Sequence, residues 1–421
     1  MHIYFSGIGG YGIGPLAQFA SEAGYLVSGS DLQESPLTMQ LREGGSHITI
    51  GQDGKYIFER HTKDPIDWFV YSSALPDDHP ELDFARRHHI KISKRHELLS
   101  YIIDQKGLAM IAVAGTHGKT TTTAMLVWMY RELGLPASYS IGSTVMFGPS
   151  GHYDPDSQFF FYECDEYDRN FLNFHPNMSL ITSADYDHPD TYPTEQDYRL
   201  AFNTFAHQSQ TVICWPEDAA YTGIGGSANV VTPELDPEKV GLHGAHNRRN
   251  AALAAEAIHQ LTGDDVENLA ERFSHFPGTS RRFEKLTTNL YSDYAHHPTE
   301  IASTLQMARE FSDHVVVVYQ PHQNRRQHEI KDDYKDCMQL AERIYWLPTH
   351  LSREDANQAI LSPQELTASL TNRDKVVTAQ LDEALWRAIG RERYEGKLVL
   401  LMGAGTIDAW AREQLRGEVP L

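Results

Sequence analysis

The stretch that decides the fold is Ala114-Gly115-Thr116-His117-Gly118-Lys119-Thr120-Thr121, which lies between an apolar run, Leu108–Ala114, and a helical pattern, Thr120–Leu133. Glycines let the backbone turn so that successive N–H groups face one anion, Lys119 supplies a positive charge for the β- and γ-phosphates, and the Thr120 hydroxyl can ligate Mg²⁺. Val113 stands where the strict pattern has its first glycine, so this is a shortened variant. The order of strand, turn and helix predicts an ATP site; the alternative is a glycine turn that happens to carry a lysine.

Acidic residues follow two further strand-like runs. The segment Glu163-Cys164-Asp165-Glu166-Tyr167-Asp168 ends the run Phe159–Cys164, and Asp185-Tyr186-Asp187-His188-Pro189-Asp190 follows Met178–Thr182. In α/β proteins ligands bind at the carboxyl ends of the strands, and Mg²⁺ takes one or two protein oxygens beside phosphate and water. These segments therefore predict magnesium ligands, although acidic residues in such places can also be solvated turns.

The alternation of strand, glycine turn and helix recurs along the chain. At roughly 150 residues per domain, 421 residues suffice for about three domains. A linker at Tyr101–Gly107 and turn residues at Phe276–Thr279 predict three α/β domains in series, residues 1–106, 107–277 and 278–421. The first and third are expected to be Rossmann-like and the central one ATPase-like. Val315–Tyr319 and Leu398–Met402 are typical of strands buried on both faces.

Composition excludes several classes of protein. The net charge of −21 would repel a nucleic-acid backbone, so no nucleic-acid partner is expected. No run approaches the roughly 18 apolar residues of a membrane span, and the first residues lack the basic start of a secretory signal. Three widely spaced cysteines suit a reducing compartment. We therefore expect a cytoplasmic protein without a membrane partner.

A second glycine-rich loop follows the first strand-like run, Met1–Ser6. Gly7, Gly9 and Gly12 have the spacing of a dinucleotide fingerprint, and Asp31 stands nineteen residues after Gly12. This pattern is compatible with a nicotinamide-dependent oxidoreductase. It is equally compatible with a UDP-sugar, because the physical requirement is only a diphosphate at a helix N-terminus.

Taken together, these motifs resemble the ATP-dependent Mur ligases of peptidoglycan synthesis. The resemblance extends over almost the whole chain, in the family's order. It also rests on segments outside the loops already described: Tyr71-Ser72-Ser73-Ala74, Arg95-His96-Glu97-Leu98, His246-Asn247-Arg248-Arg249-Asn250-Ala251-Ala252, Arg281-Arg282-Phe283-Glu284, Asp293-Tyr294-Ala295-His296-His297-Pro298-Thr299-Glu300, Gln320-Pro321-His322 and Gly403-Ala404-Gly405.

The resemblance implies a role for each matched position. The phosphate loop with Asn250, Arg282 and Asp293 would bind ATP, and Thr120, Glu163 and His188 would surround magnesium. The catalytic group would consist of Lys119, His188, Glu163 and Arg326. The UDP-sugar would bind to Gly7, Ile8, Gly9, Gly10, Gly12, Asp31, Ser72, Ser73 and Arg95, and the amino acid to His297, His322 and Arg326. The alternatives are a structural role for Asn250 as a helix residue, structural caps or surface charge for Ser73 and Arg95, and a surface role for Arg326.

The resemblance also implies the reaction. The lactyl carboxylate of UDP-N-acetylmuramate would attack the γ-phosphoryl group of ATP, and L-alanine would then attack the acyl phosphate, with His188 or His297 as candidate proton acceptors. ATP and Mg²⁺ are the expected cofactors, domain closure would exclude water, and the protein would be a monomer or homodimer. The alternatives are transfer of a peptide, as in murein tripeptide recycling, and a non-catalytic nucleotide-binding homologue.

Some positions depart from the family's pattern. Phe147-Gly148-Pro149-Ser150-Gly151 replaces a stretch that usually carries an asparagine near the sugar, and Pro189 replaces a methionine after His188. Gln323 and Asn324 stand where a basic or hydroxyl residue and an aromatic residue are common. The departures at Gln323 and Asn324 leave the identity of the acceptor amine open.

Overall fold

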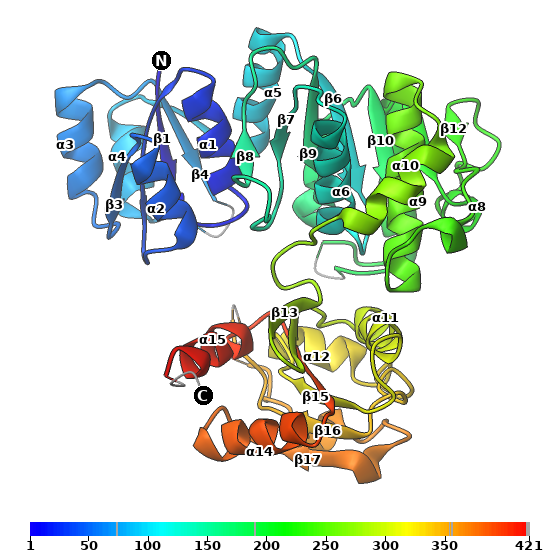
Figure 1. The fold of residues 1–421 in the computed structure, drawn as a ribbon. Helices are drawn as coiled ribbons and strands as arrows, with labels where there is room; N and C mark the ends of the chain where they lie inside the picture. The colour runs from blue at the N-terminus through cyan, green and yellow to red at the C-terminus, as the bar shows by residue number, and fades with distance from the viewer. Residues whose placement is uncertain (73–74, 189–190, 353, 355–356, 418–421) are drawn as a thin grey trace. The chain divides into compact units, whose positions relative to one another are not determined.

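A computed structural model describes residues 1–72, 75–188, 191–352, 354 and 357–417. Contacts between residues divide the chain into two compact units, one formed by Met1–Val240 with Asn250–Pro277 and the other by Gly241–Arg249 with Gly278–Leu421. Figure 1 shows three sheets covered by helices, each built from one stretch of the chain. The α/β class and the series of three modules are therefore confirmed.

The first sheet has five parallel strands in the order β3-β2-β1-β4-β5. Because the strand order reverses beside β1, the loop that follows β1 lies at the topological switch point, where α/β sheets bind ligands. The elements are β1 (His2–Ser6), α1 (Gly14–Glu22), β2 (Leu26–Asp31), α2 (Pro36–Glu43), β3 (His47–Ile50), α3 (Lys55–Lys63), β4 (Trp68–Tyr71), α4 (Pro80–Arg87), β5 (Lys91–Lys94) and α5 (Arg95–Lys106).

Helix α5 corrects one expectation from the sequence. The predicted linker Tyr101–Gly107 is the last part of this helix, which continues to Lys106. Ile102 and Ile103 are buried in the same core as α1 and the central sheet, so the segment is held by packing. Gly107 then ends the helix in the left-handed conformation, with φ of 65°.

The second sheet has the order β12-β11-β10-β6-β9-β7-β8 and is parallel except for the β7–β8 pair. The phosphate loop follows β6, which pairs with β9 on one side and with β10 on the other. The segments after all three strands therefore meet at one edge. The elements are β6 (Ala109–Ala114), α6 (Lys119–Glu132), β7 (Ser138–Ser140), β8 (Gly151–His152), β9 (Phe159–Glu163), η1 (Tyr167–Asn173), β10 (Met178–Ile181), α7 (Glu195–Gln208), β11 (Thr211–Cys214), α8 (Pro216–Thr222), β12 (Val230–Val231), η2 (Pro237–Lys239), α9 (Ala245–Thr262), α10 (Val266–Arg272) and η3 (Phe273–His275).

The third sheet has the order β13-β14-β18-β15-β16-β17, with only β13 and β14 antiparallel among its described pairs. Successive residues of β15 and β18 enter two different cores, which confirms that both strands are buried on two faces. The elements are β13 (Glu284–Thr287), β14 (Leu290–Asp293), α11 (Pro298–Arg309), β15 (Val315–Tyr319), α12 (Asn324–Ile330), β16 (Arg343–Trp346), α13 (Pro363–Leu366), η4 (Arg373–Lys375), β17 (Val376–Thr378), α14 (Glu383–Tyr394), β18 (Leu398–Met402) and α15 (Ile407–Gly417).

Two further observations concern the cysteines and the helices. Cys164, Cys214 and Cys337 are buried and free. Within the described part of the chain, no helix combines the length and the apolar character needed to cross a membrane.

Candidate functional site

The phosphate loop is built from backbone conformations that require glycine. Gly115 and Gly118 have φ angles of 136° and 83°, where side chains are strained. There is also no room for a side chain at either position. A Cβ on Gly115 would lie 2.3 Å from Thr182 Oγ1, and one on Gly118 would lie 2.9 Å from the amide of Asn250. Asn250 thus packs against the turn that starts α6, which gives it a structural contact beside its predicted contact with ATP.

The loop is attached to the segment that follows β10. The backbone N–H of His117 donates to Ser183 Oγ at 2.9 Å, and the Thr182 hydroxyl donates to the His117 carbonyl. The Thr116 hydroxyl bonds to the Asp185 carbonyl and to Tyr198 Oη, both at 2.7 Å. Thr116 therefore holds the loop in place, whereas Thr120 and Lys119 face the carboxylates that follow β9.

Lys119 forms a buried ion pair with Glu166. Its Nζ lies 2.8 Å and 3.0 Å from the two carboxylate oxygens and donates to the carbonyls of Gly115 and Thr116 at 2.6 Å and 3.2 Å. Burial alone would lower the pKa of Lys119 and raise that of Glu166. The two opposite charges outweigh burial, so the pKa of Lys119 is raised and that of Glu166 is lowered. Both groups are therefore ionised at neutral pH.

Two oxygen donors lie together beside this pair. The Thr120 hydroxyl donates to Glu163 Oε1 at 2.7 Å, and the other oxygen of Glu163 accepts the N–H of Gly142 at 2.7 Å. Hydroxyl and carboxylate oxygens suit Mg²⁺, whereas the imidazole of His188 is a poorer donor for this ion. The described residues contain no group of three or more His, Cys, Asp or Glu side chains arranged around one metal position. Thr120 and Glu163 thus fit a magnesium ion that takes its remaining ligands from phosphate and water.

His188 follows β10 in a left-handed conformation, with φ of 57°. Its Nε2 lies 3.5 Å from Glu166 Oε1, so Glu166 faces both His188 and Lys119. The imidazole also meets the edge of the Tyr167 ring, with 5.2 Å between centroids. Pro189, the predicted departure next to His188, lies outside the described residues.

The glycine-rich loop after β1 is held by Asp31. The N–H groups of Gly7 and Ile8 donate to the Ser30 carbonyl, and the N–H of Gly9 donates to Asp31 Oδ2 at 2.8 Å. Gly10 lies in the same turn, where its N–H donates to the Gly7 carbonyl. One carboxylate oxygen of Asp31 thus shapes the loop that is predicted to bind a diphosphate.

Residues beside this loop complete the predicted sugar-nucleotide group. Gly7, with φ of 82°, faces Ser72, since a Cβ there would lie 3.2 Å from Ser72 Cβ. The N–H of Ser72 donates to the Ser6 carbonyl. Ser73 lies outside the described residues.

Arg95 links the first loop to the central sheet. Its Nη1 donates to the Gly12 carbonyl at 3.2 Å, and its Nη2 lies 3.8 Å from Asp165 Oδ2. The adjacent Lys94 pairs with Asp168 at 2.7 Å. A cavity of about 170 Å³ lies here, lined by Tyr11, Gly12, Leu16, Arg95, Leu99, Ser140, Gly142, Tyr162, Glu163 and Asp165. One cavity is therefore bordered both by predicted sugar-nucleotide residues and by a predicted magnesium ligand.

The segment 147–151 packs against the first module. Gly151 donates its N–H to Gln18 Oε1 at 3.0 Å, and a Cβ at this position would lie 1.9 Å from the Pro15 carbonyl oxygen. The carbonyl of Phe147 accepts a hydrogen bond from Arg131. This departure from the family's pattern therefore has a structural function between α1 and β8.

In the second unit, Asp293 ends β14 and binds its own chain. Its carboxylate accepts the N–H groups of Phe283 and Ala295 at 2.7 Å and 2.8 Å. Burial raises the pKa of Asp293. Arg282 lies over the Tyr294 ring, 5.3 Å from its centroid. The sequence predicted that Asp293 and Arg282 contact ATP, and here Asp293 also fixes the turn that carries Arg282.

Arg326 lies beside His296, the first of three neighbouring imidazoles that follow β14, β15 and β16. Arg326 Nη1 lies 2.9 Å from His296 Nε2, and the His296 ring meets the edge of His322, which in turn stacks on His350 at 5.6 Å. Burial lowers the pKa of His296, and burial with the neighbouring His350 and Arg326 lowers that of His322 to about 4. His296 and His322 are therefore neutral at pH 7, and the guanidinium of Arg326 carries the positive charge.

His297 differs in position from its neighbour. It is the residue that precedes α11, and its N–H donates to Glu300 at 3.3 Å. His296, which the sequence did not single out, lies 2.9 Å from Arg326 Nη1 through its Nε2. Residue type alone could not predict which of these adjacent histidines lies beside Arg326, because that depends on where the strand β14 ends.

The two departures after His322 have different surroundings. Gln323 has φ of 60° and donates its N–H to the His350 carbonyl. Asn324 is buried, and its side chain bonds to the Ala359 carbonyl and the Leu361 N–H at 3.0 Å and 2.8 Å. Asn324 therefore secures a neighbouring segment, while Gln323 turns the chain at the start of α12.

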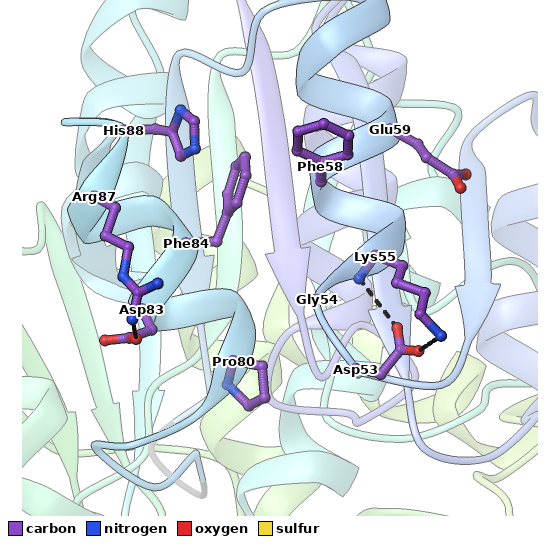
Figure 2. A pocket seen from close by; sticks show the side chains of 10 residues that line it. All are labelled: Asp53, Gly54, Lys55, Phe58, Glu59, Pro80, Asp83, Phe84, Arg87 and His88. Atoms are coloured by element: carbon purple, nitrogen blue, oxygen red, sulfur yellow. Dashed lines mark hydrogen bonds and ion pairs between the residues drawn. The ribbon is translucent and has the colours of Figure 1, made fainter.

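A groove lies between α3 and α4 of the first module. Figure 2 shows the rings of Phe58, Phe84 and His88 between α3 and α4, in a groove of about 550 Å³. Ion pairs from Lys55 to Asp53 and from Arg87 to Asp83 border it. None of the residues predicted for the site is among those that line it.

Sequence reasoning missed Glu166, His296 and His350. Glu166 and His296 stand inside motifs that were quoted, and the only local signal was their position just after a strand. His350 follows β16 by four residues and comes beside His322 through parallel strand pairing. No sequence spacing marks that pair.

Three mostly parallel sheets, a phosphate loop and adjoining oxygen donors define a nucleotide-binding α/β protein. Family models described as "Mur ligase family, catalytic domain" and "Mur ligase, glutamate ligase domain" match residues 2–106 and 281–405. A UDP-N-acetylmuramate–L-alanine ligase from Renibacterium salmoninarum is 32% identical, over 96% of this chain and 93% of that protein. The chain belongs to the Mur ligase family.

Solved structures agree with this assignment. The UDP-N-acetylmuramate–alanine ligase from Thermotoga maritima superimposes with a TM-score of 0.78 and 25% identity, over 99% of each chain. A murein peptide ligase from Psychrobacter arcticus shares the fold, with a TM-score of 0.68 and 22% identity over the full length of both chains.

Proposed function

We propose that this chain joins L-alanine to the lactyl carboxylate of UDP-N-acetylmuramate with cleavage of ATP to ADP and phosphate, a step of peptidoglycan biosynthesis. Membership of the Mur ligase family and the name of the Renibacterium salmoninarum relative support this activity. The observation that carries it is the cavity that Gly12 and Arg95 share with Glu163. In this cavity, the carboxylate of a substrate bound to the glycine-rich loop after β1 would lie next to the phosphate loop.

We further propose a division of tasks along the chain. Residues 1–106 would bind the UDP-sugar, residues 107–277 the ATP, and residues 278–421 the amino acid. The grouping of the glycine-rich loop with the first sheet, of the phosphate loop with the second and of the Arg326 group with the third supports this division. Turnover would then depend on both units of the chain.

In the nucleotide site, the phosphate loop between β6 and α6 would bind the phosphates at the N-terminus of α6. Lys119 would offset the charge that spreads over the equatorial oxygens of the transferred phosphoryl group. Thr120 and Glu163 would hold Mg²⁺, which when bound neutralises charge on the β- and γ-phosphates. Glu166, between Lys119 and His188, would keep both side chains at the edge of the loop.

The reaction would proceed in two steps. A carboxylate oxygen of the lactyl group attacks the γ-phosphorus, the bond to ADP breaks, and an acyl phosphate forms. The neutral amine of L-alanine then attacks the acyl carbon, phosphate leaves, and the nitrogen loses one proton. Arg326 is proposed to bind the amino acid carboxylate with two parallel hydrogen bonds, in a pocket with His322 and His297. His188 and His297 remain the proposed acceptors of that proton.

The test is release of phosphate that requires ATP, Mg²⁺, UDP-N-acetylmuramate and an amine together. A panel with L-alanine, other amino acids and the murein tripeptide identifies the acceptor, and the expected product is UDP-N-acetylmuramoyl-L-alanine with ADP. Formation of AMP would refute the acyl-phosphate route. Absence of product with every acceptor would support a non-catalytic homologue, and reduction of substrate by NAD(P)H would support an oxidoreductase.

A further inference from the structure

A network of hydrogen bonds, buried at its centre and partly buried at its two ends, joins the loops that present His296 and His322. The Tyr319 hydroxyl donates to the His296 carbonyl at 3.1 Å and lies 2.8 Å from the Tyr334 hydroxyl. Tyr334 donates to Gln327 Oε1 at 2.7 Å, and Gln327 Nε2 donates to the His322 carbonyl at 3.0 Å. The hydrogen-bond network therefore connects the backbone of the His296 loop to the backbone of the His322 loop.

All three connecting side chains are fully buried. Tyr319, Tyr334 and Gln327 have 0% exposed surface, and the Trp346 ring meets the edges of both tyrosine rings at 5.0 Å and 5.2 Å. The hydroxyl of Tyr334 gives its only proton to Gln327, so the proton of Tyr319 is shared between the Tyr334 oxygen and the His296 carbonyl. Buried polar networks with every member bonded fix a single arrangement, whereas loss of one member leaves its partners unsatisfied.

The loops at the two ends carry the groups around Arg326. His296 Nε2 lies 2.9 Å from Arg326 Nη1, and the two histidine rings meet at 5.9 Å between centroids. A shift of either backbone loop would therefore change the distance between the imidazoles and the guanidinium. Tyr334 comes from the segment after α12 and contacts none of these three side chains through its described hydrogen bonds.

We propose that Tyr334 and Gln327 are positioning residues for the amino acid acceptor, acting through the backbones of His322 and His296. The inference rests on the proposed function, because it assumes that the acceptor binds between these loops. The phosphate loop and the glycine-rich loop belong to the second and first sheets. Asp293, a predicted ATP residue of the third sheet, is held by the N–H groups of Phe283 and Ala295 and not by this network.

The experiment compares Tyr334→Phe with Tyr345→Phe in the full-length protein. Both substitutions remove one buried hydroxyl from the same unit and leave the ring in place, but Tyr345 bonds to Glu392 and packs in the other core. We expect Tyr334→Phe to raise KM for L-alanine about tenfold, while KM for ATP and for UDP-N-acetylmuramate changes less than twofold. Tyr345→Phe should leave all three constants within twofold, and thermal unfolding measures whether the two variants lose similar stability.

A second variant, Gln327→Met, keeps the side-chain length and removes both hydrogen bonds. It should raise KM for L-alanine in the same way. An active wild-type enzyme with an unchanged KM for L-alanine in both Tyr334→Phe and Gln327→Met refutes this inference alone. An equal rise in all three constants, or the same rise in Tyr345→Phe, also refutes it, because a general loss of structure would then explain the result. A wild-type protein that forms no product refutes the proposed function and this inference together.

Discussion

The replacement Glu166→Gln tests the ion pair at the centre of the phosphate loop. The substitution keeps the shape of the side chain and removes its charge, while Lys119 keeps only neutral acceptors among its described partners, the carbonyls of Gly115 and Thr116 and the amide oxygen of the new glutamine. Breaking a buried ion pair typically costs about 3–5 kcal/mol, because an uncompensated charge remains. The carboxylate is 1% exposed and the lysine 14%, so solvent screens the pair weakly. We expect the lower end of this range, about 3 kcal/mol, because the two carbonyls continue to accept from Lys119.

The pH dependence of this loss follows from the two pKa shifts. The lowered pKa of Glu166 contributes stability that is present above its unfolded value and is lost as the pH falls through the folded value. The raised pKa of Lys119 contributes stability that is lost only as the pH rises through its folded value, above 10.5. The difference between wild type and Glu166→Gln should therefore be constant from about pH 6 to pH 9 and should shrink below about pH 4.5.

Urea unfolding of the nucleotide-free protein at pH 7.5 and pH 4 measures this difference. The matched control is Glu267→Gln, which removes an ion pair to Lys239 in which both side chains are more than half exposed. It should leave the unfolding midpoint almost unchanged. Equal midpoints for wild type and Glu166→Gln at pH 7.5 would refute the reasoning, as would a loss of the same size at both pH values.

Three further substitutions test other parts of the chain. Lys119→Ala should abolish ADP release in a coupled assay while calorimetry still detects binding of UDP-N-acetylmuramate, since the glycine-rich loop belongs to another sheet; loss of both would contradict separate sites. Arg326→Lys should raise KM for L-alanine at least tenfold, or about 1.4 kcal/mol, because an ammonium cannot form two parallel bonds with a carboxylate; an unchanged KM would exclude that contact. Gly151→Ala should reduce the free energy of unfolding by about 1–3 kcal/mol through overpacking, because its Cβ would lie 1.9 Å from the Pro15 carbonyl oxygen. The melting temperature should fall accordingly. Gly390→Ala, where a Cβ meets nothing within 4 Å, is its control and should not lower it.

The sequence predicted the strands and the phosphate loop well because their signals are local. The runs Val315–Tyr319 and Leu398–Met402 form strands with the predicted ends. Each is apolar throughout, so burial on both faces leaves few alternatives. In contrast, the predicted linker Tyr101–Gly107 was wrong, because the packing of Ile102 and Ile103 decides that segment and no local signal shows their partners.

The roles of individual polar side chains were less predictable than the strands. Glu163 and Glu166 stand in the same motif, yet Glu163 meets Thr120 and Glu166 meets Lys119. Glu163 is the last residue of β9, whereas Glu166 stands three residues beyond it, so the two carboxylates meet different partners. Tyr334 carries no motif at all, and its bond to Tyr319 depends on how the segment after α12 returns to the sheet.

Burial has opposite results for the basic side chains of the two proposed sites: Lys119 is charged and His322 is neutral. In the first unit a buried carboxylate keeps Lys119 charged, so the loop can offset the negative charge of a transferred phosphoryl group at any pH near neutrality. In the second unit burial keeps His322 neutral, with a pKa lowered to about 4. In the proposed amino acid site, a neutral imidazole can accept a hydrogen bond from an amine but cannot bind a carboxylate by charge, and that contact would be left to the guanidinium of Arg326. Groups of different charge would then distinguish the amino group and the carboxylate of the acceptor, and they would orient it with its amine toward the imidazole.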